Sequence, residues 1–147
     1  MTEYDVGLIC GSFDLIHPGY IRMFKDAKFL CKKLTVALQG DPTLDRPHKH
    51  KPVQSLEGRR EILESLIYVD HIETYNTEKE LLELLQSTPH DVRILGDDYV
   101  GNESYTGAEL GKPVYYHSRD HEYSTSALKE AIFAEIFHRK NIGLDKK

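Results

Sequence analysis

The sequence predicts an α/β fold, in which a mostly parallel, five-stranded sheet lies between two layers of helices. Five apolar segments with strand character alternate with four segments whose apolar residues recur at helical spacing. Parallel neighbours need a crossover connection, which a helix supplies. The 147 residues contain no internal repeat, so we expect one domain over residues 1–140 and a loose tail over 141–147.

The first strand and the first helix are expected near residues 4–10 and 18–32. The strand is an apolar run, and Phe24 and Ala27 mark the inward face of the helix. Pro18 suits a first helical turn, where its missing N–H is not needed.

The middle of the chain continues the alternation. A strand is expected at 34–38, followed by a mobile loop over 40–53, which holds three prolines and shows no periodicity. Ser55 can cap a helix near 56–67, because its hydroxyl can accept a bond from a free N–H of the first turn.

The last elements have similar signals. Thr77 and Ser124 can cap the two remaining helices, and Leu128 and Ile132 begin an apolar stripe that continues to Ile136 and Phe137. The expected elements are strands at 69–75, 91–95 and 113–117 and helices at 78–87 and 125–138.

Composition limits the kinds of partner. The net charge of −5 argues against binding to a nucleic-acid polymer, and no apolar run is long enough to span a membrane. We see no signal peptide and expect a cytoplasmic protein. Of the two cysteines, Cys10 lies in a strand and Cys31 is expected on a helix face, both as buried reduced thiols.

The polar residues that follow the strands should gather at one edge of the sheet. Ligands of open parallel sheets bind outside the carboxyl ends of the strands. The loops 11–19, 40–53, 96–112 and 118–123 therefore converge there. They bring together a Gly-Ser turn, an imidazole, several cations and a helix start: Gly11, Ser12, His17, Lys49, Lys51, Arg59, Arg119, Ser124, Thr125 and Ser126. This set favours phosphate binding and nucleotidyl transfer over acyl chemistry.

The segment Gly11-Ser12-Phe13-Asp14-Leu15-Ile16-His17-Pro18-Gly19-Tyr20 resembles the Gly-x-Phe-Asp-x-x-His-x-Gly-His signature of cytidylyltransferases in the nucleotidyltransferase superfamily. Four further segments are similar to the family in the same order: 57–63, 68–70, 96–99 and 123–129. The overall resemblance is greatest to the small bacterial glycerol-3-phosphate cytidylyltransferases. It implies a Rossmann-like three-layer sandwich and a homodimer.

The resemblance also implies a reaction, in which a small phosphorylated alcohol attacks the α-phosphate of CTP and releases pyrophosphate with the help of Mg²⁺. The metal ligands are not assigned. By motif position, the catalytic residues would be His17, Tyr20, Lys49 and Arg119. The nucleotide would be bound by Gly11, Ser12, Phe13, Asp14, Lys51, Arg59, Asp97, Asp98, Ser124, Thr125 and Ser126.

Two departures from the family pattern bear on activity. Tyr20 stands where the signature has its second His, and a phenol with a pKa near 10 stays neutral. Ile67 stands where the relatives carry an Arg that supports the turn across a dimer interface. His121, in the loop before the last helix, offers an imidazole that could replace the missing one.

These departures leave alternatives open. The chain could be a nucleotide-binding protein of the same fold with weak or no transferase activity, or an adenylyltransferase that uses ATP. The choice of nucleotide depends on base contacts in the loop 96–112. Tyr20 could be a packing aromatic residue, and Lys49, Lys51 and Arg59 could be surface cations.

Overall fold

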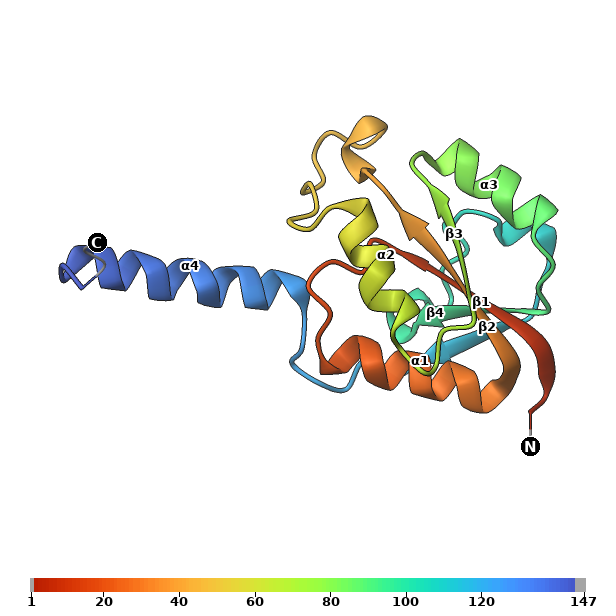
Figure 1. Ribbon diagram of the computed structural model, residues 1–147. Helices are drawn as coiled ribbons and strands as arrows, with labels where there is room; N and C mark the ends of the chain where they lie inside the picture. Colours follow the sequence, from red (N-terminus) through yellow and green to blue (C-terminus); the bar gives the residue numbers. More distant parts are fainter. Residues whose placement is uncertain (1, 145–147) are drawn as a thin grey trace.

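The computed structural model describes residues 2–144 and confirms the α/β fold (Figure 1). All five strands are parallel, in the spatial order β3-β2-β1-β4-β5. The strands are β1 (Tyr4–Gly11), β2 (Cys31–Gln39), β3 (His71–Tyr75), β4 (Val92–Gly96) and β5 (Val114–His117). The α-helices are α1 (Pro18–Leu30), α2 (Leu56–Glu64), α3 (Glu78–Ser87) and α4 (Thr125–Asn141). Residues 145–147 of the expected tail lie outside the described residues.

Both faces of the sheet are covered. Phe24 and Ala27 of α1 and Leu63 of α2 pack into one apolar cluster with strand residues of the first face. Leu81 and Leu85 of α3 pack into a second cluster on the other face. Burial of each large apolar side chain contributes about 1.5–3 kcal/mol, so these two layers hold the sheet in place.

The three helix caps expected from the sequence are confirmed. The side chains of Ser55, Thr77 and Ser124 each accept a backbone N–H from the first turn of the helix that follows. At Thr77 the cap is reciprocal, because the carboxylate of Glu80 accepts the N–H of Thr77. These local bonds set where α2, α3 and α4 begin.

The expectation that Cys31 lies on a helix face is wrong. Helix α1 ends at Leu30, and Cys31 is the first residue of β2, where it pairs with Tyr4 of β1. The extended backbone of Cys31 still donates its N–H to the carbonyl of Ala27, which ends the helix. Both cysteines are free thiols, as expected, although only Cys31 is fully buried.

Helix α4 extends away from the sheet (Figure 1). None of its residues is buried, and its apolar stripe is exposed rather than packed. Phe133 is 69% exposed and Phe137 is 56% exposed. The helical spacing of the stripe predicted the helix but could not show what covers it, and nothing within residues 2–144 does so.

Candidate functional site

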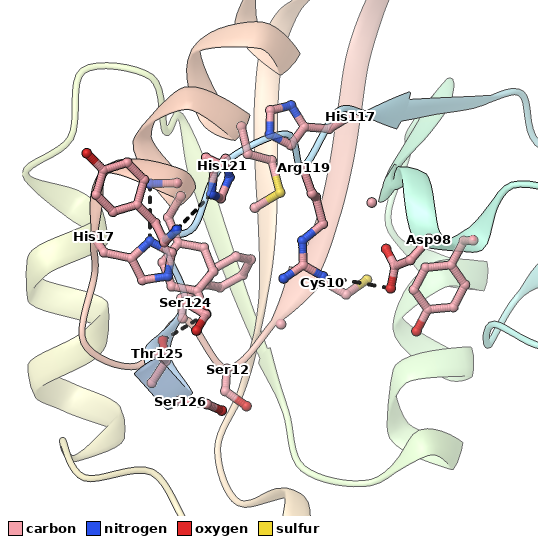
Figure 2. A pocket seen from close by; sticks show the side chains of 18 residues that line it. Cys10, Ser12, His17, Asp98, His117, Arg119, His121, Ser124, Thr125 and Ser126 are labelled. Atoms are coloured by element: carbon pink, nitrogen blue, oxygen red, sulfur yellow. Dashed lines mark hydrogen bonds and ion pairs between the residues drawn. The ribbon is translucent and has the colours of Figure 1, made fainter. Parts of the chain in front are cut away.

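The candidate site is an open cavity of about 360 Å³ at the carboxyl ends of β1, β4 and β5 (Figure 2). The chain order reverses between β1 and β4, which is where open α/β sheets bind ligands. Its lining includes most residues that the sequence predicted for this edge: Gly11, Ser12, Phe13, His17, Tyr20, Asp98, Arg119, Ser124, Thr125 and Ser126.

The turn after β1 has a strained backbone. Phe13 and Leu15 have φ values of 48° and 52°, in the left-handed region that side chains other than glycine rarely adopt. The ring of Phe13 is buried between Phe24 and Tyr20, and these ring contacts fix the backbone of the turn. This packing holds the backbone of the turn beside the cavity, which Gly11, Ser12 and Phe13 line.

The carboxylate of Asp14 connects the turn to the segment before α2. It accepts the N–H groups of Val53 and Gln54 at 2.7 and 3.0 Å. The Nζ of Lys129 lies 3.8 Å from the same carboxylate. Asp14 is buried, and its bonds join the end of the loop 40–53 to the turn. Asp14 therefore orders the site.

His17 caps α1 and is a neutral donor. Its Nδ1 accepts the N–H of Gly19 at 3.1 Å, so the ring proton lies on Nε2, which bonds to no residue within 2–144. Burial lowers the pKa of His17, and the charges of His121 and Arg119 lower it further. At neutral pH the ring can therefore donate Nε2–H to a phosphate oxygen.

The hydroxyl of Tyr20 is already used within the protein. The hydroxyl of Thr125 donates to the carbonyl of Asp14 at 2.7 Å, which uses its only proton. The bond of 3.2 Å between Tyr20 and Thr125 must therefore have the phenol as its donor. The ring of Tyr20 stacks on His17 with centroids 4.1 Å apart. Tyr20 thus joins α1 to the start of α4 and supports His17.

Arg119 is held at the rim by the loop after β4. Its N–H donates to the carboxylate of Asp97 at 3.2 Å, and its guanidinium lies 3.7 Å from the carboxylate of Asp98. Asp98 lines the cavity, whereas Asp97 only supports the backbone of Arg119. A phosphate group could compete with Asp98 for this guanidinium.

Lys49 and Lys51, the two predicted cations of the loop 40–53, lie in different surroundings. Lys49 lines a neighbouring cavity that shares Ser12 and Ser126 with the first. Lys51 is exposed and lies 3.8 Å from the carboxylate of Asp41, outside the lining of both cavities. Of the two lysines, Lys49 is therefore the one placed to contact a ligand.

Arg59 does not line the cavity. It is 2% exposed, and its guanidinium donates to five carbonyl oxygens behind the turn. The acceptors are Ser12, Gln39, Gly40, Gln54 and Ser55, at 2.6 to 3.3 Å. Arg59 thus gathers the carboxyl ends of β1 and β2 and the start of α2, so its place is that of a buried support.

The cavities are also lined by residues that the sequence-based candidate set did not contain, among them Tyr99, His117 and Lys129. Tyr99 and His117 line the first cavity, and Lys129 lines its neighbour. Lys129 falls within the family-like segment 123–129, which could have revealed it. Tyr99 likewise ends the family-like segment 96–99, whereas no pattern in the sequence marked His117.

Cys10 lines the cavity, but its thiol is not activated. Burial raises the pKa of its thiol to about 11, and the nearby charge of Arg93 opposes this only in part. The thiol is therefore protonated at neutral pH and is a poor nucleophile. This agrees with a site that works by binding phosphate rather than by forming a covalent intermediate.

The protonation of His17 can be measured directly. In an NMR titration of the wild-type protein, we expect His17 to titrate below the ordinary value of 6.5, with its neutral ring protonated at Nε2. Arg119→Gln should raise that pKa part of the way, because a repelling charge is removed while the burial remains. A His17 that titrates at or above 6.5 would contradict this account.

Within residues 2–144, no group of three or more His, Cys, Asp or Glu side chains is placed to hold a metal ion. The same range has no helix that is long and apolar enough to cross a membrane.

Comparisons with known proteins agree with this geometry. Residues 8–131 match the family model described as cytidylyltransferase-like. The bifunctional protein HldE of Helicobacter pylori strain HPAG1 is 33% identical over 123 residues, which are 83% of this chain and 26% of that protein. HldE of Paramagnetospirillum magneticum is 34% identical over 131 residues, which are 85% of this chain and 26% of that protein.

This chain thus spans about a quarter of the length of the curated relatives that it matches. A solved structure titled as the lipopolysaccharide core biosynthesis protein from Thermoplasma volcanium GSS1 has the same fold, with a TM-score of 0.60. It covers 82% of this chain and 99% of its own, at 23% identity, so the likeness concerns the fold alone.

Proposed function

The chain belongs to the cytidylyltransferase-like family, and from that premise we propose that it transfers CMP from CTP to a small phosphomonoester such as glycerol 3-phosphate. The single observation that carries the proposal is the cavity that joins the turn after β1, the neutral ring of His17, Arg119 and the start of α4. These groups supply hydrogen-bond donors and the cation of Arg119 to one cavity, which suits a triphosphate.

The proposed transfer needs no protein nucleophile. An oxygen of the acceptor phosphate forms a bond to the α-phosphorus, and the bond to the bridging oxygen breaks, so pyrophosphate leaves with the electron pair. The Nε2–H of His17 donates to an α-phosphate oxygen, and Arg119 and the hydroxyl of Ser126 bind the leaving phosphates. Donors placed where charge develops lower the barrier, and removal of one such donor costs about 10²–10³ in rate.

A second cavity next to the first could hold the small acceptor. It has a volume of about 380 Å³ and shares Cys10, Gly96 and Tyr99 with the first. Its lining includes Arg46 and Arg93, whose guanidinium groups suit the phosphate of an acceptor. The carboxylate of Glu78 lies 3.3 Å from the guanidinium of Arg46, and an acceptor phosphate would compete with it. An acceptor there would lie next to the nucleotide in the first cavity.

Mg²⁺ would enter with the triphosphate. Both carboxylate oxygens of Asp14 accept backbone N–H groups, and Asp98 faces Arg119, so we assign neither as a dedicated ligand. Mg²⁺ often keeps several waters and takes phosphate oxygens as ligands. When bound, it neutralises phosphate charge. Lys49 and Arg119 would hold the oxygens that the metal does not.

A pyrophosphate-release assay tests the proposed function. The purified protein is incubated with Mg²⁺, with CTP or ATP, and with glycerol 3-phosphate or another phosphomonoester. We expect release that depends on both substrates and is faster with CTP. Faster release with ATP would make the chain an adenylyltransferase. Nucleotide binding without release under any acceptor would overturn the transferase assignment.

We also propose that the chain forms a homodimer through α4. An isolated helix of 17 residues is marginally stable without packing, yet α4 exposes Ile132, Phe133 and Phe137. In an antiparallel pair of α4 helices, Glu130 near one end would face Lys140 near the other. A second copy therefore matches both the apolar stripe and the charges.

Phe133→Glu should convert the dimer to a monomer, because it places a carboxylate in the apolar stripe. Light scattering after gel filtration measures the mass. Ile67→Glu is the matched control, since Ile67 is 83% exposed on another part of the molecule. A wild-type monomer, or a dimer that only Ile67→Glu disrupts, would refute the α4 interface.

A further inference from the structure

We propose that His121 binds the phosphates of the nucleotide through its Nε2–H, as a second imidazole donor beside His17. This rests on the proposed function, because it assigns a further catalytic residue to the same cavity. His121 belongs to the loop between β5 and α4 and lines the cavity with His17 (Figure 2).

The two imidazoles meet at Gly19. A Cβ atom at this glycine would lie 2.6 Å from Cε1 of His121 and 2.9 Å from Nδ1 of His17. Both rings therefore occupy the space that a side chain at position 19 would need, and any larger residue there would push them apart. This close approach explains the glycine and places the two rings at one end of the cavity.

The two rings also share the same hydrogen-bonding state. The Nδ1 of His121 accepts the N–H of Tyr123 at 3.1 Å, as the Nδ1 of His17 accepts that of Gly19. In the neutral form each ring therefore carries its proton on Nε2. The Nε2 of His121 bonds to no other residue within 2–144, so its N–H is left for a ligand.

The phenol of Tyr20 cannot fill this role, since its proton goes to Thr125. The cavity would otherwise have one ring donor, from His17. The loop residue His121 supplies a second from a position more than one hundred residues along the chain. Two N–H donors can bind two oxygens of a phosphate group, and they strengthen as charge moves onto those oxygens.

Two variants separate a ligand contact from a structural one. In His121→Gln, the side-chain amide reaches the position of Nε2 and keeps a donor there. It no longer places an acceptor at Nδ1 for the N–H of Tyr123. In His121→Asn, the amide oxygen keeps the acceptor at Nδ1 and loses the distant donor. If His121 binds phosphate, the Gln variant should keep more function than the Asn variant. A purely structural role predicts the reverse order.

The first readout is calorimetric binding of inorganic tripolyphosphate. We expect His121→Asn to weaken binding about 10-fold or more, His121→Gln to weaken it less, and the control His71→Ala to leave it unchanged. His71 is an exposed residue of β3 whose ring contacts Glu73. An Asn variant that binds as tightly as the wild type, or a wild type with no affinity, would overturn the proposal.

The second readout is kcat for pyrophosphate release, which we expect to fall by about 10²–10³ in His121→Asn. The two measurements test the two proposals separately. A wild type that releases no pyrophosphate refutes the proposed function, while tripolyphosphate binding by the two variants still decides whether His121 contacts phosphate.

Discussion

His17→Asn is expected to lower kcat for pyrophosphate release by about 10²–10³-fold while leaving the fold intact. Asparagine is among the best residues at a helix N-cap, so it can replace Nδ1 as the acceptor of the Gly19 N–H. It cannot replace the Nε2–H, which lies farther from the backbone. The loss would therefore report the donor to the α-phosphate and not the cap.

The control for this variant is thermal unfolding together with the activity of His71→Ala. The melting temperature of His17→Asn should stay close to that of the wild type. The activity of His71→Ala should also be unchanged, since His71 lies on the edge strand β3 outside the cavity lining. A His17→Asn variant with wild-type kcat would show that the ring does not act on the transferred phosphate.

Arg59→Ala is expected to reduce the free energy of unfolding by about 3 kcal/mol or more, because it leaves buried carbonyl oxygens without donors. For a domain of this size that loss corresponds to a decrease of roughly 6–12 °C in the melting temperature. The five acceptors of Arg59 lie in the turn after β1, at the end of β2 and the residue that follows it, and in the two residues before α2. The loss would also loosen the turn that lines the cavity.

Arg60→Ala is the matched control on the same helix. Arg60 is exposed, and its ion pair with Glu64 at 2.9 Å is of the i,i+4 type, worth about 0.3–0.5 kcal/mol. Its melting temperature should therefore stay within roughly 2 °C of the wild type. An Arg59→Ala protein that is equally stable would show that water can satisfy those carbonyls.

The fold could be predicted because its signals are local. The periodicity of strands and helices is set by residues close together in the sequence, and so are the helix caps. Each of the caps Ser55, Thr77 and Ser124 lies where expected. The start of β2 was misplaced because strand pairing with Tyr4 extends it back to Cys31, beyond its apolar run. The partner of α4 could not be inferred, since an apolar stripe does not reveal what it packs against.

The candidate site was predictable in part for the same reason. The turn from Gly11 to His17 is one continuous segment, whereas the bond from Tyr20 to Thr125 spans 105 residues. The five carbonyls around Arg59 are likewise brought together only by the sheet. An arginine that follows a helix cap looks like a surface cation in the sequence, and only its burial at 2% reveals the support.

A crystal structure with a non-hydrolysable CTP analogue tests the central claim most directly. We predict that the triphosphate occupies the cavity at the ends of β1, β4 and β5. The Nε2 of His17 should lie within hydrogen-bonding distance, about 3 Å, of an α-phosphate oxygen, near the start of α4. A triphosphate bound outside this cavity, or one that the ring of His17 does not contact, would contradict the account.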